Sequence, residues 1–267
     1  MSLTLGLSGL NLNLNLEAIM IKLDTSKGRE AIVNSAMTEV GSKIREVGGS
    51  NKGARVEQYQ KVVHIPPGAP GCAAYVSWCT TNGLGMEKKP KWAGGGAVGL
   101  YHKAAGALRK LGMDEYHATP EERHKVKPGW VFSQSRDADG AKQARKGAYT
   151  LGHTGLVVGL DPNDPDVFIT AEGNTNSAGA REGDGVYQKT RKFSDAKMVG
   201  FFDPVAATVA NFKPEELAEL EAGTQINFAF AKLDTADDEE KEKKKGGGGG
   251  VLGLLAAAAG VYFMTKA

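Results

Sequence analysis

The stretch PPGAPGCAAYVSWCTTNG, residues 66–83, decides how the rest of the chain is interpreted. Prolines and glycines fill residues 66–71 and end any preceding helix, and the run over 72–83 then has the composition of a short helix that ends at an Asn-Gly pair. The same stretch holds both cysteines of the chain, Cys72 and Cys79. It therefore predicts a helix that carries one thiol in its first turn and a second thiol further along.

The two thiols are expected to differ in chemistry. Residues seven apart on a helix share a face but lie about 10.5 Å apart along its axis, so Cys72 and Cys79 cannot form a disulfide with each other. Exposed backbone N–H groups and the helix dipole favour a thiolate at Cys72, whereas Cys79 lies two turns deeper beside Trp78. Because a free cysteine is most often a small buried hydrophobe, we interpret Cys79 as a core residue and Cys72 as a candidate nucleophile.

Hydrophobic spacing upstream and downstream of this helix predicts an α+β domain over residues 26–204. Four helices come first, and short β-rich runs follow, so that the helices and an antiparallel sheet are separate in sequence. The expected helices are 26–48, 54–62, 72–83 and 98–112, and the expected strands are 129–133, 154–160, 166–173, 185–193 and 198–202. The polar, basic segment 134–152 is expected to be a long loop, either functional or disordered.

The N-terminal arm, residues 1–25, has no Lys or Arg before Lys22, so the basic start of a secretory signal is missing. Leucine and asparagine alternate over residues 10–16, which places leucines on one face if the segment is extended. We expect this arm to pack or assemble with a partner, or to be disordered.

The C-terminal part changes composition twice. Residues 205–250 contain a short helical pattern followed by the charged and glycine-rich run DDEEKEKKKGGGGG, which is typical of a flexible linker. The segment 251–267 contains an uncharged stretch, 251–264, that would span roughly 21 Å as a helix against a hydrocarbon core of about 30 Å. We expect a membrane-anchoring tail, with a buried or interfacial segment as the alternative.

The charge balance gives no global argument for nucleic acid, because 33 Lys and Arg nearly match 31 Asp and Glu for a formal net charge of +2. None of the five histidines stands in a metal-binding spacing with a cysteine. We therefore predict no nucleic-acid partner, no metal and no cofactor.

A thiolate nucleophile needs a base, and the base needs a group to orient it. His153 is the best candidate base, because it lies at the mouth of a β-run between glycines, in GHTGLVVGLD. The other histidines lie in helical or loop segments without a supporting pattern. The next strand contains FITAEGNTN, in which Glu172 and Asn174 are two residues apart and would emerge on one face to hold the imidazole. A helix-borne cysteine and strand-borne histidine make the arrangement of a papain-like amidase.

These segments, in this order, resemble the CHAP family of cysteine amidohydrolases and peptidases, within the NlpC/P60 and papain-like group. The resemblance covers roughly residues 28–202, and its most specific parts are the block around Cys72 and the pair GHTGLVVG and EGNTN. It implies a peptidoglycan hydrolase that cleaves an amide bond, either between muramic acid and L-alanine or within the peptide stems and bridges. It also implies Cys72 as nucleophile, His153 as general base, Glu172 as the orienting residue and Asn174 as an accompanying site residue.

The chain departs from the family pattern in two places. Family members often carry Trp before the cysteine and Asp in the KPGW segment, where this chain has Gly71 and Trp130. The segment 134–152 also looks longer than the family's usual link. These changes affect substrate specificity more than chemistry, because no proton-transfer group is lost.

The combination of parts suggests a phage-type or virion-associated lysin, tethered to a membrane by its tail and contacting virion proteins through its arm. Two other interpretations stay open: a non-catalytic structural or wall-binding module of the same fold, and a cysteine amidase that acts on another amide.

Overall fold

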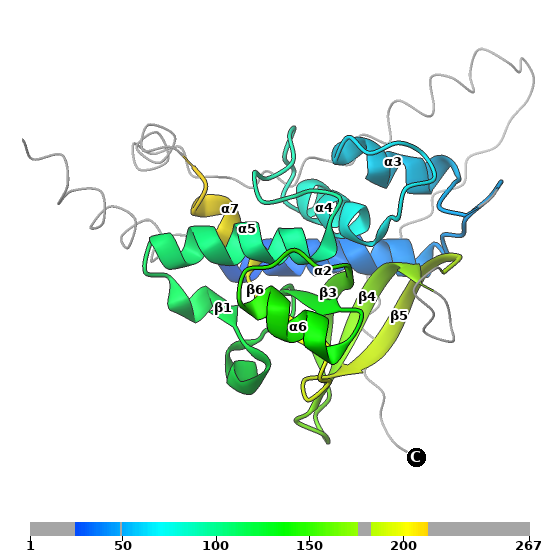
Figure 1. Cartoon of the computed structure of the whole chain (residues 1–267). Helices are drawn as coiled ribbons and strands as arrows, with labels where there is room; N and C mark the ends of the chain where they lie inside the picture. The colour runs from blue at the N-terminus through cyan, green and yellow to red at the C-terminus, as the bar shows by residue number, and fades with distance from the viewer. Residues whose placement is uncertain (1–24, 49, 176–182, 213–267) are drawn as a thin grey trace, which may run out of the picture. The chain divides into compact units, whose positions relative to one another are not determined.

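The computed structural model describes residues 25–48, 50–175 and 183–212, and helices come first in this part of the chain. They include the predicted helix with both thiols, whose bounds match the expectation (Figure 1). The helices are α2 (Thr25–Gly41), α3 (Ala54–Val62), α4 (Cys72–Gly83) and α5 (Ala97–Lys110). The 3-10 turns η1 (Asp114–Tyr116) and η2 (Pro120–Lys125) then lead into the sheet.

One six-stranded antiparallel sheet follows, with strand order β1-β6-β2-β3-β4-β5. Its strands are β1 (His117–Ala118), β2 (Val131–Ser135), β3 (Gly152–Leu160), β4 (Val167–Thr175), β5 (Gly185–Lys192) and β6 (Met198–Phe202). Helices followed by an antiparallel sheet confirm the prediction of an α+β fold.

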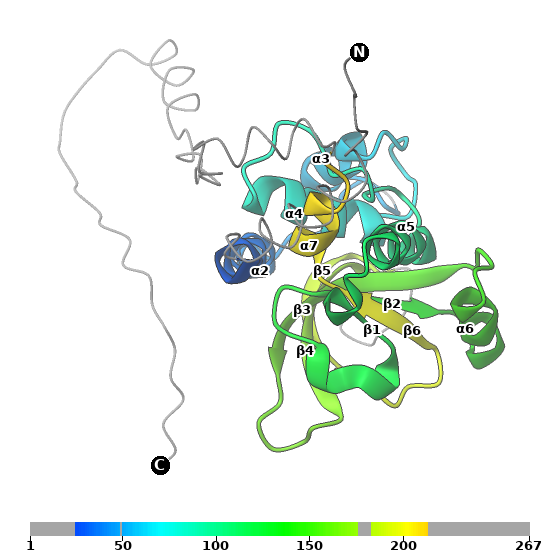
Figure 2. The same ribbon diagram turned by 90° about the vertical axis from the view of Figure 1, so that its left-hand side faces the viewer.

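Successive strand residues supply two separate hydrophobic clusters. Val131 and Leu156 belong to the larger cluster, which joins the sheet to the helices, whereas the next residues, Phe132 and Val157, belong to a second, aromatic cluster. This alternation follows from the two-residue period of a strand. Figure 2 shows the resulting layers, with α2, α3, α4, α5 and α7 on one side of the strands. The sheet therefore contributes to a hydrophobic cluster on each of its faces.

The expectation of a loop over 134–152 is wrong in its middle, where α6 (Ala138–Arg145) forms. Asp137 caps this helix by accepting a hydrogen bond from the backbone N–H of Gly140 at 2.6 Å. Only Ala141 and Ala144 are buried on this helix, so its apolar face consists of two small residues. The rest of the helix is polar, so the segment is easily read as a polar loop despite its helical periodicity.

The folded unit also continues past the predicted boundary at Pro204. Helix α7 (Pro204–Val209) is buried throughout, because Val205, Ala206 and Ala207 fill the helix-side core. Asp203 caps it through the N–H groups of residues 205 and 206 and pairs with Arg29 of α2 at 2.8 Å. This ion pair therefore holds the chain that follows the last strand, β6, against α2, the first described helix.

The predicted arm and tail fall almost entirely outside the described residues. This holds for residues 1–24, for 213–250 with its linker, and for the predicted anchor 251–267. In the part of the chain that the structure describes, no helix is both long enough and apolar enough to cross a bilayer.

Candidate active site

Helix α4 begins at Cys72, so the structure places this thiol in a helical first turn, as predicted. The N-cap is Gly71, which offers no side-chain acceptor, and the first intrahelical bond runs from Tyr75 N–H to the Gly71 carbonyl at 2.8 Å. The N–H groups of Cys72, Ala73 and Ala74 therefore precede the first helical hydrogen bond and point out of the helix end. This end combines a thiol with backbone donors.

A glycine on the neighbouring strand lets α4 approach the sheet closely. A Cβ atom at Gly173 of β4 would lie 2.6 Å from the Cβ of Tyr75, well inside van der Waals contact. Tyr75 is fully buried, and its hydroxyl donates to the Ala36 carbonyl of α2 at 3.1 Å. The helix that carries Cys72 is thus fixed between α2 and the strand that carries Glu172.

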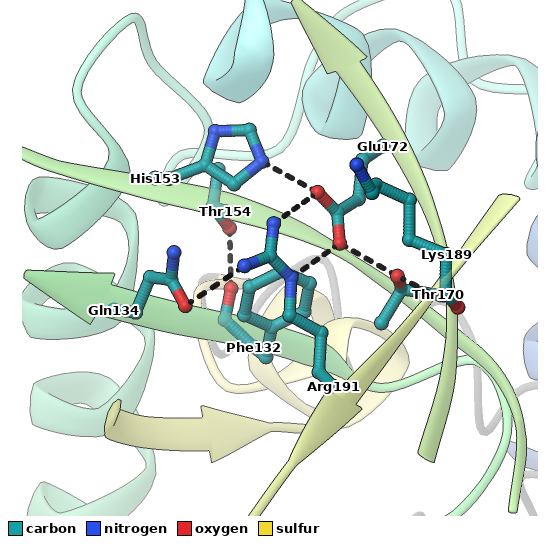
Figure 3. A network of polar contacts seen from close by, with 8 residues as sticks. All are labelled: Phe132, Gln134, His153, Thr154, Thr170, Glu172, Lys189 and Arg191. Carbon is teal, nitrogen blue, oxygen red and sulfur yellow. Dashed lines mark hydrogen bonds and ion pairs between the residues drawn. The ribbon is translucent and has the colours of Figure 1, made fainter. Parts of the chain in front are cut away.

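His153 and Glu172 are brought together across β3 and β4. The imidazole Nε2 lies 2.8 Å from a Glu172 carboxylate oxygen, and the two residues are 6% and 0% exposed (Figure 3). Space for this contact comes from Gly155, where a Cβ would lie 2.8 Å from the Cγ of Glu172. With Nε2 committed to Glu172, Nδ1 is the ring nitrogen that can serve the Cys72 thiol, and Nδ1 makes no hydrogen bond within the described residues.

Two residues that were not predicted from the sequence hold Glu172. Arg191 of β5 makes a bidentate pair with this carboxylate, with N···O distances of 2.7 and 2.6 Å, and the Thr170 hydroxyl donates to it at 2.6 Å (Figure 3). Each carboxylate oxygen of Glu172 therefore accepts a hydrogen bond from Arg191 in addition to any contact with the imidazole. In the structure, Tyr187, Lys189 and Arg191 form the partly buried face of β5, but polar residues stand on both faces of this strand in the sequence and gave no signal.

The pKa shifts at the site favour a thiolate on Cys72 and an imidazolium on His153. Burial alone would raise the pKa of the Cys72 thiol, but the interaction with His153 and the backbone groups of Ala73 and Thr154 lower it below its usual value. Burial would lower the pKa of His153, yet Cys72 and Glu172 together raise it to about 9. Both shifts favour the charged forms.

The pKa of Glu172 is lowered to about 2, because Arg191 and His153 outweigh the opposing effect of burial. The carboxylate is therefore ionised over the whole physiological pH range. An ionised carboxylate on Nε2 fixes the tautomer of the neutral ring and stabilises the protonated ring, which is the role of the acidic member of a catalytic triad.

Asn174 lies beside Gly71, at the start of α4, and not on the imidazole. It occupies a bulge of β4 with φ of 55°, a left-handed conformation that asparagine tolerates, and it is 8% exposed. Its Cβ lies 3.8 Å from where a Cβ at Gly71 would be, and its buried Oδ1 makes no hydrogen bond within the described residues. Of the two strand residues proposed to orient His153, the structure therefore selects Glu172 and leaves the Asn174 amide beside the start of α4.

The remaining positions behave as structural residues. Trp130, which stands where the family pattern often has Asp, is 2% exposed and packs in the aromatic cluster. Cys79 is fully buried, as predicted. Among the described residues, no group of three or more His, Cys, Asp or Glu side chains is arranged to hold a metal ion.

Comparisons with known proteins identify no relative. The chain matches no family model, no curated protein and no solved structure.

Proposed function

We propose that this chain is a papain-like cysteine amidase of the CHAP and NlpC/P60 type that hydrolyses an amide bond of peptidoglycan. The observation that supports it best is the buried contact of His153 with Glu172 at 2.8 Å, together with a Cys72 thiol at the start of α4 whose pKa His153 helps to lower. It supplies a thiol of lowered pKa, a base and a buried ionised carboxylate that orients the base.

In the proposed reaction, His153 holds the proton of Cys72 and the thiolate attacks the carbonyl carbon of the amide. The carbonyl oxygen becomes an oxyanion, which the backbone N–H groups at the start of α4 can stabilise by about 3 kcal/mol per donor. Collapse breaks the C–N bond, and the imidazolium gives its proton to the leaving amine. Water, deprotonated by His153, then attacks the thioester and releases the acid and the free thiol.

The choice of peptidoglycan rests on the resemblance around Cys72 and in GHTGLVVG and EGNTN. The biological setting follows from the segments outside the described residues. We propose a phage-type or virion-associated lysin with its tail on a membrane and its arm on virion proteins.

Zymography on purified cell walls tests the proposal, with the unaltered protein and Cys72→Ala run side by side. We expect clearing by the unaltered protein alone, and mass spectrometry of the released fragments identifies the bond. If neither protein clears walls but both bind them, the chain is a wall-binding module. If walls stay intact and another amide is cut, it is an amidase of different specificity.

A further inference from the structure

Exposed apolar side chains gather just before His153. Tyr149 and Leu151 are 73% and 59% exposed, and they are two of the four large hydrophobic residues that stand exposed in the described part of the chain. An extended chain rises about 3.3 Å per residue, so Thr150 between them lies at most about 10 Å from His153. Exposed apolar groups at this distance from a reaction centre are typical of a substrate-contacting surface.

Tyr149 is held in place although it is exposed. The neighbouring Ala148 carbonyl lies 3.1 Å from Nε2 of His102 on α5, and the His102 and Tyr149 rings meet edge to face with centroids 5.2 Å apart. The Tyr149 ring also lies over Gly99, where a Cβ would be 3.6 Å from its Cε1. An aromatic ring fixed in this way can bind a ligand at little entropic cost.

A cavity of about 260 Å³ opens beside this ring, and its opposite side is backbone. It is lined by Gly94, Gly95 and Gly96 together with Gly99, Tyr149 and Thr150. The glycine run is tied to α4, because the Ser77 hydroxyl of that helix lies 3.4 Å from the Gly94 carbonyl. A floor without side chains lets the main chain of a ligand approach closely.

The charge of this cavity is positive. Lys103 lines it, with its Nζ 3.7 Å from where a Cβ at Gly94 would be. Among the residues that the structure describes, no Asp or Glu lines the cavity and no ion pair joins Lys103 to a carboxylate. Lys91 and Lys110 line the adjoining groove, and no Asp or Glu of the described residues lines it. An anionic ligand is therefore favoured over a neutral or cationic one.

We propose that this cavity is the subsite for the peptide part of the substrate, with the peptide backbone over Gly94–Gly96, its apolar side chains against Tyr149 and Leu151, and a peptide carboxylate paired with Lys103. This inference deepens the proposed function and rests on it. The substrate class is an anionic peptide with small side chains, such as a peptidoglycan stem, and the sugar lies outside this cavity.

Binding to a Cys72→Ala chain tests the subsite separately from catalysis. Titration calorimetry would use a soluble disaccharide–tetrapeptide, the free tetrapeptide, its fully amidated form and the disaccharide alone. We expect the tetrapeptide to keep most of the affinity and the disaccharide to show none. Tyr149→Ala should weaken tetrapeptide binding about tenfold, and Lys103→Gln about threefold to tenfold. Amidation of the peptide should abolish the effect of Lys103→Gln.

Matched controls separate a local contact from a general loss of structure. Tyr149→Phe keeps the ring and should bind normally, and Leu160→Ala removes the exposed leucine at the other end of β3, where it is 44% exposed. In the active chain, the subsite variants should raise KM and leave kcat within about threefold, as expected for groups that bind ground state and transition state equally.

The two proposals fail in different ways. If the active chain cleaves walls but Tyr149→Ala and Lys103→Gln bind the tetrapeptide normally, the subsite is wrong and the proposed function stands. If no fragment binds to Cys72→Ala, or only the disaccharide binds, the subsite is also overturned. If the active chain cleaves no wall but the tetrapeptide binds through Tyr149 and Lys103, the subsite stands and the proposed hydrolysis fails.

Discussion

The two cysteines of α4 show how far the chemistry of a thiol can change within two helical turns. Cys72 and Cys79 are 6% and 0% exposed, so simple access to water does not distinguish them. Burial raises the pKa of Cys79 far above its ordinary value, and the carboxylate of Glu39 adds to the effect, although Tyr75 opposes it. The pKa of Cys72 is lowered, although burial opposes ionisation there as well.

The difference lies in what surrounds each sulfur. Cys72 meets the imidazole of His153 and backbone groups of residues 73 and 154, all of which favour a negative charge. Cys79 meets a phenol and a carboxylate inside the helical core. At Cys72, the imidazole and the backbone groups outweigh burial, whereas at Cys79 the favourable effects of Arg55, Tyr75 and Ser35 do not, and the pKa stays raised.

The largest effect is expected from replacing each of the two cysteines by alanine in turn. Cys72→Ala should lower kcat/KM for wall hydrolysis by at least about 10³-fold, because the nucleophile is removed. Cys79→Ala should change kcat/KM less than about threefold and lower the free energy of unfolding by about 1–3 kcal/mol. Fragment release and urea unfolding of both variants check this, and an inactive but stably folded Cys79→Ala chain would contradict the assignment.

The next largest effect is expected from the carboxylate that orients the base. Glu172→Gln should lower kcat by about 10²–10⁴-fold, because the amide no longer fixes the tautomer or stabilises the imidazolium. Since Glu172 helps to raise the pKa of His153 to about 9, the alkaline limb of the pH–rate profile should move from near 9 toward lower pH. An unchanged alkaline limb would exclude the His153–Glu172 contact from the reaction.

Glu172→Gln also changes stability in a pH-dependent way. The folded pKa of Glu172, about 2, lies below the ordinary value near 4.3, so the carboxylate stabilises the fold above that value and loses this effect as the pH falls toward 2. The unaltered chain should therefore exceed Glu172→Gln in stability at pH 7, and the gap should close in acid. Thermal unfolding across this pH range measures it.

A smaller effect is expected at Asn174, where backbone strain and side-chain chemistry can be separated. Asn174→Gly keeps the left-handed conformation and removes the amide, whereas Asn174→Ala removes the amide and strains the backbone. If the amide contacts the substrate beside Cys72, both variants should lose about tenfold in kcat/KM, and only Asn174→Ala should lose stability. Full activity of Asn174→Gly would show that the residue serves the bulge alone.

The sequence predicts the chemistry-bearing residues better than their supports. Cys72 and His153 follow from helix-start chemistry and a strand between glycines, both of which are local patterns. Arg191 could not be found in the same way, because it opposes Phe168 rather than Glu172 in the β4–β5 register. Its contact with Glu172 depends on a long side chain crossing the sheet face.

The same limit explains the glycines and α6. Gly155 and Gly173 read as ordinary strand glycines, and only the approach of Glu172 and Tyr75 shows why a side chain would not fit. Helix α6 was missed because its buried face consists of two alanines. Patterns that lie within one element are visible in the sequence, whereas clearances between elements are not.

The most direct test of the account is the titration of the Cys72 thiol in a Cys79→Ala chain, which then contains a single cysteine. Thiolate absorbance, or the rate of alkylation by iodoacetamide, is followed from pH 4 to pH 10. We expect an apparent pKa clearly below the ordinary value of about 8.5, and a rise above that value in Cys79→Ala with His153→Ala, where burial acts unopposed. A thiol that titrates at or above about 8.5 in both chains would contradict the claim that His153 and the start of α4 make Cys72 a nucleophile.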